Sequence, residues 1–105
     1  MEIKNAYAVN INFDGDIRSE TTGFHVFAGE GAEGEVRALV IQALKDMNEH
    51  SIKRYGYDMY IIDFFGKEIE ISEALNDNQI LDDFIDSGGE SFGNWDINIY
   101  KTDET

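Results

Sequence analysis

The residues with the clearest catalytic spacing lie near the end of the chain. Gly89, Ser91 and Gly93 have the Gly-x-Ser-x-Gly spacing of a serine-hydrolase nucleophile elbow. Such an elbow follows a strand and precedes a helix, whereas here a predicted helix comes first and a predicted strand follows. The two histidines that could activate the serine, His25 and His50, lie far upstream. We therefore predict a glycine-rich turn at this place and no enzymatic activity.

Metal and cofactor sites are also not indicated. Asn10, Asn12 and Asp14 are spaced like calcium ligands, but Thr21 stands at the twelfth place, where a calcium loop has a bidentate glutamate. Neither histidine has further ligands at a zinc-binding spacing, and the absence of cysteine excludes disulfides, thiolate catalysis and cysteine-based zinc sites. The glycine-rich segment 29–35 has acids where a phosphate would bind. We predict neither a metal nor a cofactor.

The charge of the chain is high and unevenly distributed. Its 22 acidic and 8 basic residues give a net charge of −14. Residues 1–56 hold nine acids and six bases, residues 57–105 hold thirteen acids and two bases, and no Lys or Arg lies between Lys67 and Lys101. Because phosphate contacts need Lys and Arg, direct nucleic-acid binding is not expected, and an anionic membrane surface would repel the chain. The charge favours a basic protein surface as the partner.

The residues predicted to bind this partner come from the stretch without bases. On a predicted short helix, Asp82 and Asp83 lie four and three residues before Asp86, so the three carboxylates are neighbours on one side. Their spacing is close to that of successive phosphates on a nucleic-acid strand. The full predicted set is Glu68, Glu70, Glu73, Asp77, Asp82, Asp83, Asp86, Glu90, Phe92 and Asp96.

A surface of this kind would occupy the groove of the partner protein that is lined by Lys and Arg and otherwise holds the phosphates of a nucleic acid. We expect a nucleic-acid mimic that inhibits or masks a nuclease, a restriction or CRISPR-type effector, or a toxin nuclease, in the manner of phage counter-defence and immunity proteins. The aromatic residues Tyr60, Phe92 and Tyr100 are candidate anchors that would fix specificity, while charge would speed association. In the alternative, the charge only maintains solubility, and the chain is an adaptor or subunit that binds through a sheet face or edge.

Length and composition predict one domain. The chain has 105 residues, of which 42% are hydrophobic and periodically placed, enough for one core. The first residues lack a basic stretch followed by an apolar run, and no apolar stretch approaches the ~18–20 residues that span a bilayer. We expect a cytoplasmic domain over residues 1–101 with a flexible tail at 102–105; the sequence indicates no oligomeric state.

The elements that would position these residues follow from periodicity. Residues 6–13 alternate as a half-buried strand, Asp14-Gly15 predicts a hairpin turn, and residues 21–29 read as the return strand. A helix is expected from about Glu33 to His50. Its apolar stripe contains Val36, Leu39, Val40, Ala43, Leu44 and Met47, with Asn48 on the other side.

The second half of the sequence predicts helices and strands that are shorter than those of the first half. Residues 57–65 suit a central strand and residues 68–71 a short one. Ser72, or Asn76-Asp77 after it, can cap a short helix expected from about Asp77 to Asp86. Gly88 and Gly89 fit the C-cap of that helix, and a final strand begins at residue 95.

The order strand, strand, helix, strand, short strand, short helix, strand resembles the ubiquitin-like β-grasp fold. Residues 60–70 resemble the third strand of that family, its Gly-Lys turn and the short strand after it. Residues 74–80 resemble its Leu-x-Asp-x-x-Ile segment, and residues 95–101 stand where its last strand belongs. The resemblance implies an α+β domain in which a mixed sheet of four or five strands, with the last parallel to the first, packs on one long helix. A ferredoxin-like or other small α+β arrangement is the alternative. Conjugation is not implied, because sixteen residues follow Gly89.

Overall fold

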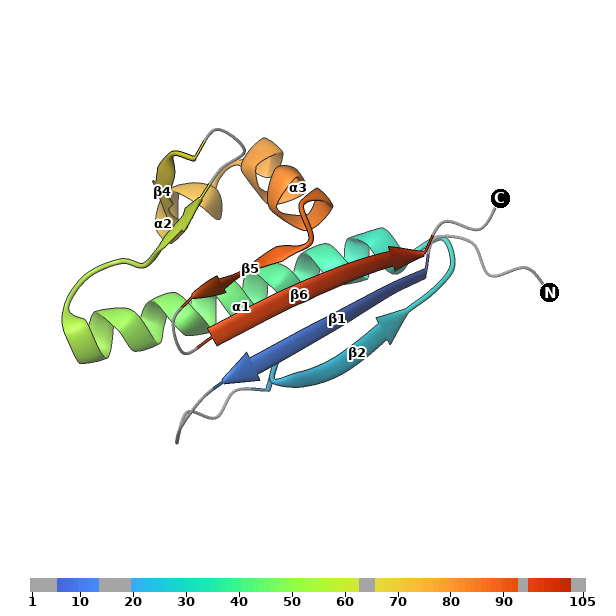
Figure 1. Ribbon diagram of the computed structural model, residues 1–105, viewed down its shortest axis with the longest axis horizontal. Helices are drawn as coiled ribbons and strands as arrows, with labels where there is room; N and C mark the ends of the chain where they lie inside the picture. Colours follow the sequence, from blue (N-terminus) through green and yellow to red (C-terminus); the bar gives the residue numbers. More distant parts are fainter. Residues whose placement is uncertain (1–5, 14–19, 63–65, 93–94, 103–105) are drawn as a thin grey trace.

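The computed structural model describes residues 6–13, 20–62, 66–92 and 95–102, which form a sheet layer and a helical layer (Figure 1). The long helix runs along one face of the main sheet, and the shorter elements group beyond one sheet edge. In chain order the elements are β1 (Ala6–Phe13), β2 (Gly23–Phe27), α1 (Ala32–Tyr55), β3 (Tyr60–Ile62), β4 (Glu68–Glu70), α2 (Ile71–Ala74), α3 (Asn78–Asp86), β5 (Gly89–Phe92) and β6 (Trp95–Thr102).

The main sheet has the strand order β2-β1-β6-β5, and every neighbouring pair is antiparallel. The predicted α+β class, with a sheet packed on a long helix, is confirmed. The predicted mixed sheet is wrong, because the first and last strands run antiparallel from the Ala6–Thr102 pair to the Phe13–Trp95 pair. The direction of β6 depends on which end of the sheet the chain reaches after β5, and strand periodicity does not encode that. The β-grasp arrangement is therefore not established by this topology.

Two further expectations about the strands are corrected. The predicted central strand at 57–65 includes only Tyr60–Ile62 among the described residues, and it pairs with β4 in a separate two-stranded sheet. The glycine-rich stretch read as a turn instead supplies β5, an edge strand of the main sheet. The predicted hairpin turn at Asp14-Gly15 lies outside the described residues.

The core lies between the main sheet and α1. The predicted stripe is confirmed for Val36, Val40, Ala43, Leu44 and Met47, which are fully buried, while Leu39 is partly buried. These side chains pack on the alternate residues of β1 and β6 that point toward the helix, and Leu81 and Phe84 of α3 join the same core. The buried strand residues are Tyr7, Val9, Ile11, Trp95, Ile97 and Ile99.

The ends of the helices follow local signals. Helix α1 continues five residues beyond the predicted end at His50 and terminates at Gly56, whose φ of 80° is left-handed and whose N–H bonds the carbonyl oxygens of Ser51 and Ile52. Gly56 and the basic residues of the last turn are helix C-terminal signals. Asp77 caps α3 as predicted, because its Oδ1 accepts from the N–H of Gln79 at 2.9 Å.

The C-terminal strand β6 includes Thr102, which the sequence placed in a tail; Thr102 pairs with Ala6 at the end of β1. Every helix in the described part of the chain is too short or too polar to cross a membrane.

Candidate functional site

Five of the predicted partner-binding carboxylates lie on consecutive elements beyond the β5 edge of the sheet (Figure 1). Their side chains are exposed, and β4, α2 and α3 pack against one another. We call these five the acidic segment: Glu68, Glu70, Glu73, Asp83 and Asp86. The chain has no Lys or Arg between residues 68 and 100, so every nearby positive charge must come from elsewhere in the fold.

Three other predicted carboxylates are used within the molecule. Asp82 forms an ion pair with Arg37 of α1, and Arg37 Nη1 also donates to Asn78 Oδ1 at 3.4 Å. Asp77 is the N-cap of α3, and Glu90 accepts a hydrogen bond from the backbone N–H of Ile62. The stretch without Lys or Arg therefore receives a counter-charge from α1 at Asp82. Packing brings α1 beside α3, a contact between residues 45 positions apart that the charge pattern did not reveal.

Asp96 is separated from the acidic segment. It lies on β6 between Trp95 and Ile97, which are buried against the α1 side, so Asp96 points to the opposite face of the sheet. We call the face directed away from α1 the open face. Tyr100 also lies on this face and is 59% exposed.

The other two candidate anchors lie elsewhere. Tyr60 is exposed on β3, directly opposite Glu70 of β4. It is therefore the candidate anchor that lies next to a residue of the acidic segment. Phe92 lies in β5, and its side chain is outside the described part of the chain.

A polar network beneath the acidic segment joins α1 to the start of α2. The Oγ of Ser72 and the Nδ2 of Asn48 donate to the two carboxylate oxygens of Asp58, at 2.8 and 3.2 Å. These hydrogen bonds lower the pKa of Asp58. The pKa of Glu70 is raised, mainly by a hydrogen bond with Asp58, with further contributions from desolvation and from the charges of Asp58 and Glu73. Glu70 therefore becomes protonated at a higher pH than an isolated glutamate.

Asn48 was placed on the outer side of the helix, and this prediction is wrong. Its side chain is 8% exposed, and its Oδ1 accepts from the backbone N–H of Met59 at 2.9 Å. Asn48 stands four residues after Leu44 and next to Met47, both in the buried stripe. A polar residue at that spacing is the sequence signal that could have located the network.

The residues of the elbow motif are not brought together with a base. Ser91 pairs opposite Asp96 and so belongs to the open face. His50 lies on α1 with its ring 6.3 Å from that of Trp95, and His25, opposite Val9, points to the α1 side and donates from Nε2 to the carbonyl oxygen of Thr21 at 2.9 Å. The sheet therefore separates the serine from both histidines. Among the described residues, no group of three or more His, Asp or Glu is arranged to hold a metal ion.

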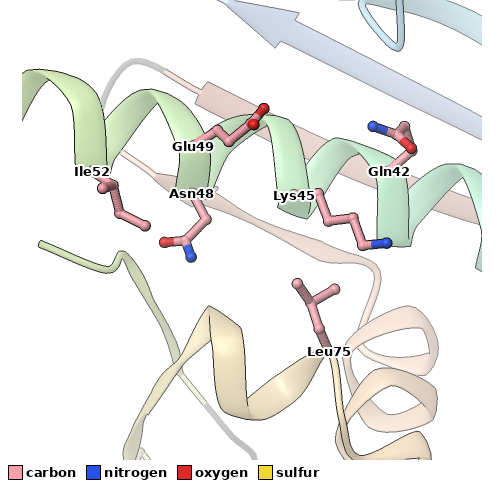
Figure 2. Close-up of a pocket in the computed structure, with 6 residues that line it drawn as sticks. All are labelled: Gln42, Lys45, Asn48, Glu49, Ile52 and Leu75. Atoms are coloured by element: carbon pink, nitrogen blue, oxygen red, sulfur yellow. The ribbon is translucent and has the colours of Figure 1, made fainter.

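A shallow hollow of about 340 Å³ lies between α1 and the end of α2 (Figure 2). Lys45, Asn48 and Ile52 extend from α1 toward Leu75, while Gln42 and Glu49 border it on the helix. Asn48 is already committed to Asp58 and Met59. The lining residues contain no hydroxyl or imidazole group, and their ionisable side chains are those of Lys45 and Glu49.

No protein-family model, curated protein or solved structure matches this chain. The candidate site therefore rests on its own geometry: exposed carboxylates on β4, α2 and α3, with the exposed Tyr60 opposite one of them, Glu70.

Proposed function

We propose that the chain is a non-enzymatic binding protein whose acidic segment occupies a basic surface of a nucleic-acid-binding partner, such as a nuclease or a restriction, CRISPR-type or toxin effector. The observation that supports this proposal is the set of five exposed carboxylates on β4, α2 and α3, within a stretch that contains no Lys or Arg. A phosphate-binding groove attracts this arrangement because it presents five exposed negative charges on adjacent elements.

The position of Tyr60 gives the acidic segment a way to be specific. Charge alone speeds association but discriminates weakly among basic proteins, whereas a large exposed aromatic side chain can fill a pocket. Tyr60 and Ile62 are 44% and 47% exposed, and they lie directly opposite Glu70 and Glu68 across the two-stranded sheet. The partner surface that fits them has apolar pockets between its Lys and Arg side chains.

The test begins with the immobilised chain and a lysate of its source cells. Retained proteins are eluted with a salt gradient and identified, and the purified partner is assayed for nucleic-acid binding and cleavage. The chain should compete with nucleic acid, and its affinity for the partner should fall steeply with salt. Asp83→Lys with Asp86→Lys should weaken binding by at least about tenfold at low salt.

The control is Glu20→Lys with Glu30→Lys. It makes the same change in charge at two exposed residues outside the acidic segment, and it should leave binding nearly unchanged. Asp82 is unsuitable for the charge reversal, because a lysine there would face Arg37 and disturb the fold. Affinity that is indifferent to both salt and the Asp83/Asp86 reversal would contradict the proposal.

A further inference from the structure

The open face of the main sheet is unusually poor in charge. It includes Phe24 and Val26 of β2, Ala8 of β1, and Asn98 and Tyr100 of β6. Among the described residues of this face, Asp96 is the one charged side chain. Charged residues make up 29% of the whole chain, so a solvent-facing sheet surface of this composition departs from the rest of the molecule.

Large apolar side chains gather on this face. Phe24, Val26 and Tyr100 are 65%, 64% and 59% exposed. Single exposed apolar residues are ordinary on protein surfaces, but several on one face of a sheet mark an interaction surface.

The pairing register gives the open face its shape. Ala8 stands directly between Val26 on one neighbouring strand and Tyr100 on the other. A small residue between two large exposed ones leaves a depression at Ala8 with a large side chain on each side. A second surface with the same relief would fit, because ridges of one sheet fill troughs of the other when two sheets pack face to face.

From this relief and lack of charge we infer that a second copy of the chain packs on the open face, sheet against sheet. A two-fold axis brings the same patch together from both copies, so Tyr100 of each lies over the depression at Ala8 of the other, beside that copy's Val26. Among its described residues, the face offers no cation to hold an acidic partner and only Asp96 to hold a basic one, whereas a second copy supplies an equally uncharged surface.

The net charge of −14 opposes association of two copies, but its densest part stays away from this interface. The acidic segment lies on elements that join the core on the α1 side of the sheet, since Leu81 and Phe84 of α3 pack there. The dimer would therefore hold two acidic segments on its outer sides. This inference is independent of the proposed function, because the two surfaces share no residue.

The size of the face predicts a reversible dimer. Strands about 4.8 Å apart that rise about 3.4 Å per residue give it an area of a few hundred Å². Two such faces bury on the order of 1,000 Å² in total, which is at the lower end for specific interfaces.

Sedimentation equilibrium of the full chain tests the inference. The expected result is a monomer–dimer equilibrium in which the dimer fraction rises with protein concentration and with salt, because salt screens the repulsion between the copies. Val26→Thr and Tyr100→Thr should each weaken dimerisation by about tenfold or more, while both keep strand-forming residues at exposed positions. Tyr57→Thr, at a residue that is 57% exposed outside the sheet, is the matched control and should leave the equilibrium unchanged.

Three results would overturn it. A monomer at every concentration and salt would do so, whether or not another protein covers the face. A dimer that is insensitive to both substitutions would place the interface elsewhere. Sensitivity to Val26→Thr without sensitivity to Tyr100→Thr would indicate pairing through the β2 edge rather than through the face.

Discussion

The backbone N–H of Ile62 donates a 3.0 Å hydrogen bond to Oε1 of Glu90, and this bond connects the small sheet to the edge strand of the main sheet. Glu90 lies opposite Ile97 and so points to the α1 side, where it is half-buried. Burial raises the pKa of Glu90, and the Ile62 N–H offsets part of that effect. One carboxylate from the stretch that contains no Lys or Arg therefore has a structural role.

The first prediction concerns this bond. Glu90→Gln keeps a side-chain oxygen that accepts from the Ile62 N–H, whereas Glu90→Ala removes this acceptor. In denaturant unfolding, the alanine variant should therefore be about 1 kcal/mol less stable than the glutamine variant. Because the pKa of Glu90 is raised above its ordinary value of 4.5, its contribution to stability is complete below that value and declines as the pH rises through the folded-state pKa. The stability of Glu90→Gln relative to the native chain should therefore increase over that pH range; a constant difference would count against the raised pKa.

The second prediction separates the two adjacent glycines. Both have a left-handed φ, 93° at Gly88 and 88° at Gly89, so alanine at either position costs about 1–2 kcal/mol of backbone strain. At Gly89 a Cβ would also overlap the carbonyl oxygen of Ile97, whereas a Cβ at Gly88 would lie 3.5 Å from its nearest neighbour, the carbonyl oxygen of Ile99. Gly89→Ala should therefore lower the free energy of unfolding clearly more than Gly88→Ala. Equal losses would show that the close approach of β5 to β6 does not restrict this position.

The third prediction concerns the ion pair between Arg37 and Asp82. Both side chains are partly exposed, so a double-mutant cycle with Arg37→Gln and Asp82→Asn should give a coupling energy of about 0.5–1 kcal/mol that falls with salt. Asp82→Lys should be more destabilising than Asp86→Lys, because only the first places a second cation beside Arg37. Thermal unfolding of the two single variants, their double variant and the two lysine variants measures both effects, and a zero coupling energy would remove this anchor between α1 and α3.

The fourth prediction concerns Asp58 and Glu70. NMR titration should place the pKa of Asp58 below 3.8 and that of Glu70 above 4.5. Ser72→Ala should raise the pKa of Asp58, and Asp58→Asn should lower that of Glu70, because each substitution removes the largest cause of the shift.

The two groups affect stability at opposite ends of the pH range. The contribution of Asp58 is present above 3.8 and is lost as the pH falls through its folded-state pKa, whereas that of Glu70 is present below 4.5 and is lost as the pH rises through its own. Identical pKa values for Glu70 in the native chain and in Asp58→Asn would contradict the assigned coupling.

Several elements could be predicted from the sequence because their signals are local. The alternation of Tyr7, Val9 and Ile11 identified the buried face of β1, and apolar spacing identified the stripe of α1. Asp77 was recognised as the cap of α3 because a carboxylate just before a helix accepts its first N–H groups. The segregation of acids from bases was likewise visible in the sequence alone.

The tertiary structure decided what depends on contacts between distant residues. It set β6 antiparallel to β1, made β5 from a stretch that read as a turn, and put Ser91 on the face opposite the histidines. It also brought Arg37 to Asp82 and left Phe24, Val26 and Tyr100 together on one uncovered face. Side-chain periodicity fixes which face of an element is apolar, but strand partners and ion pairs depend on where the packed core delivers each segment.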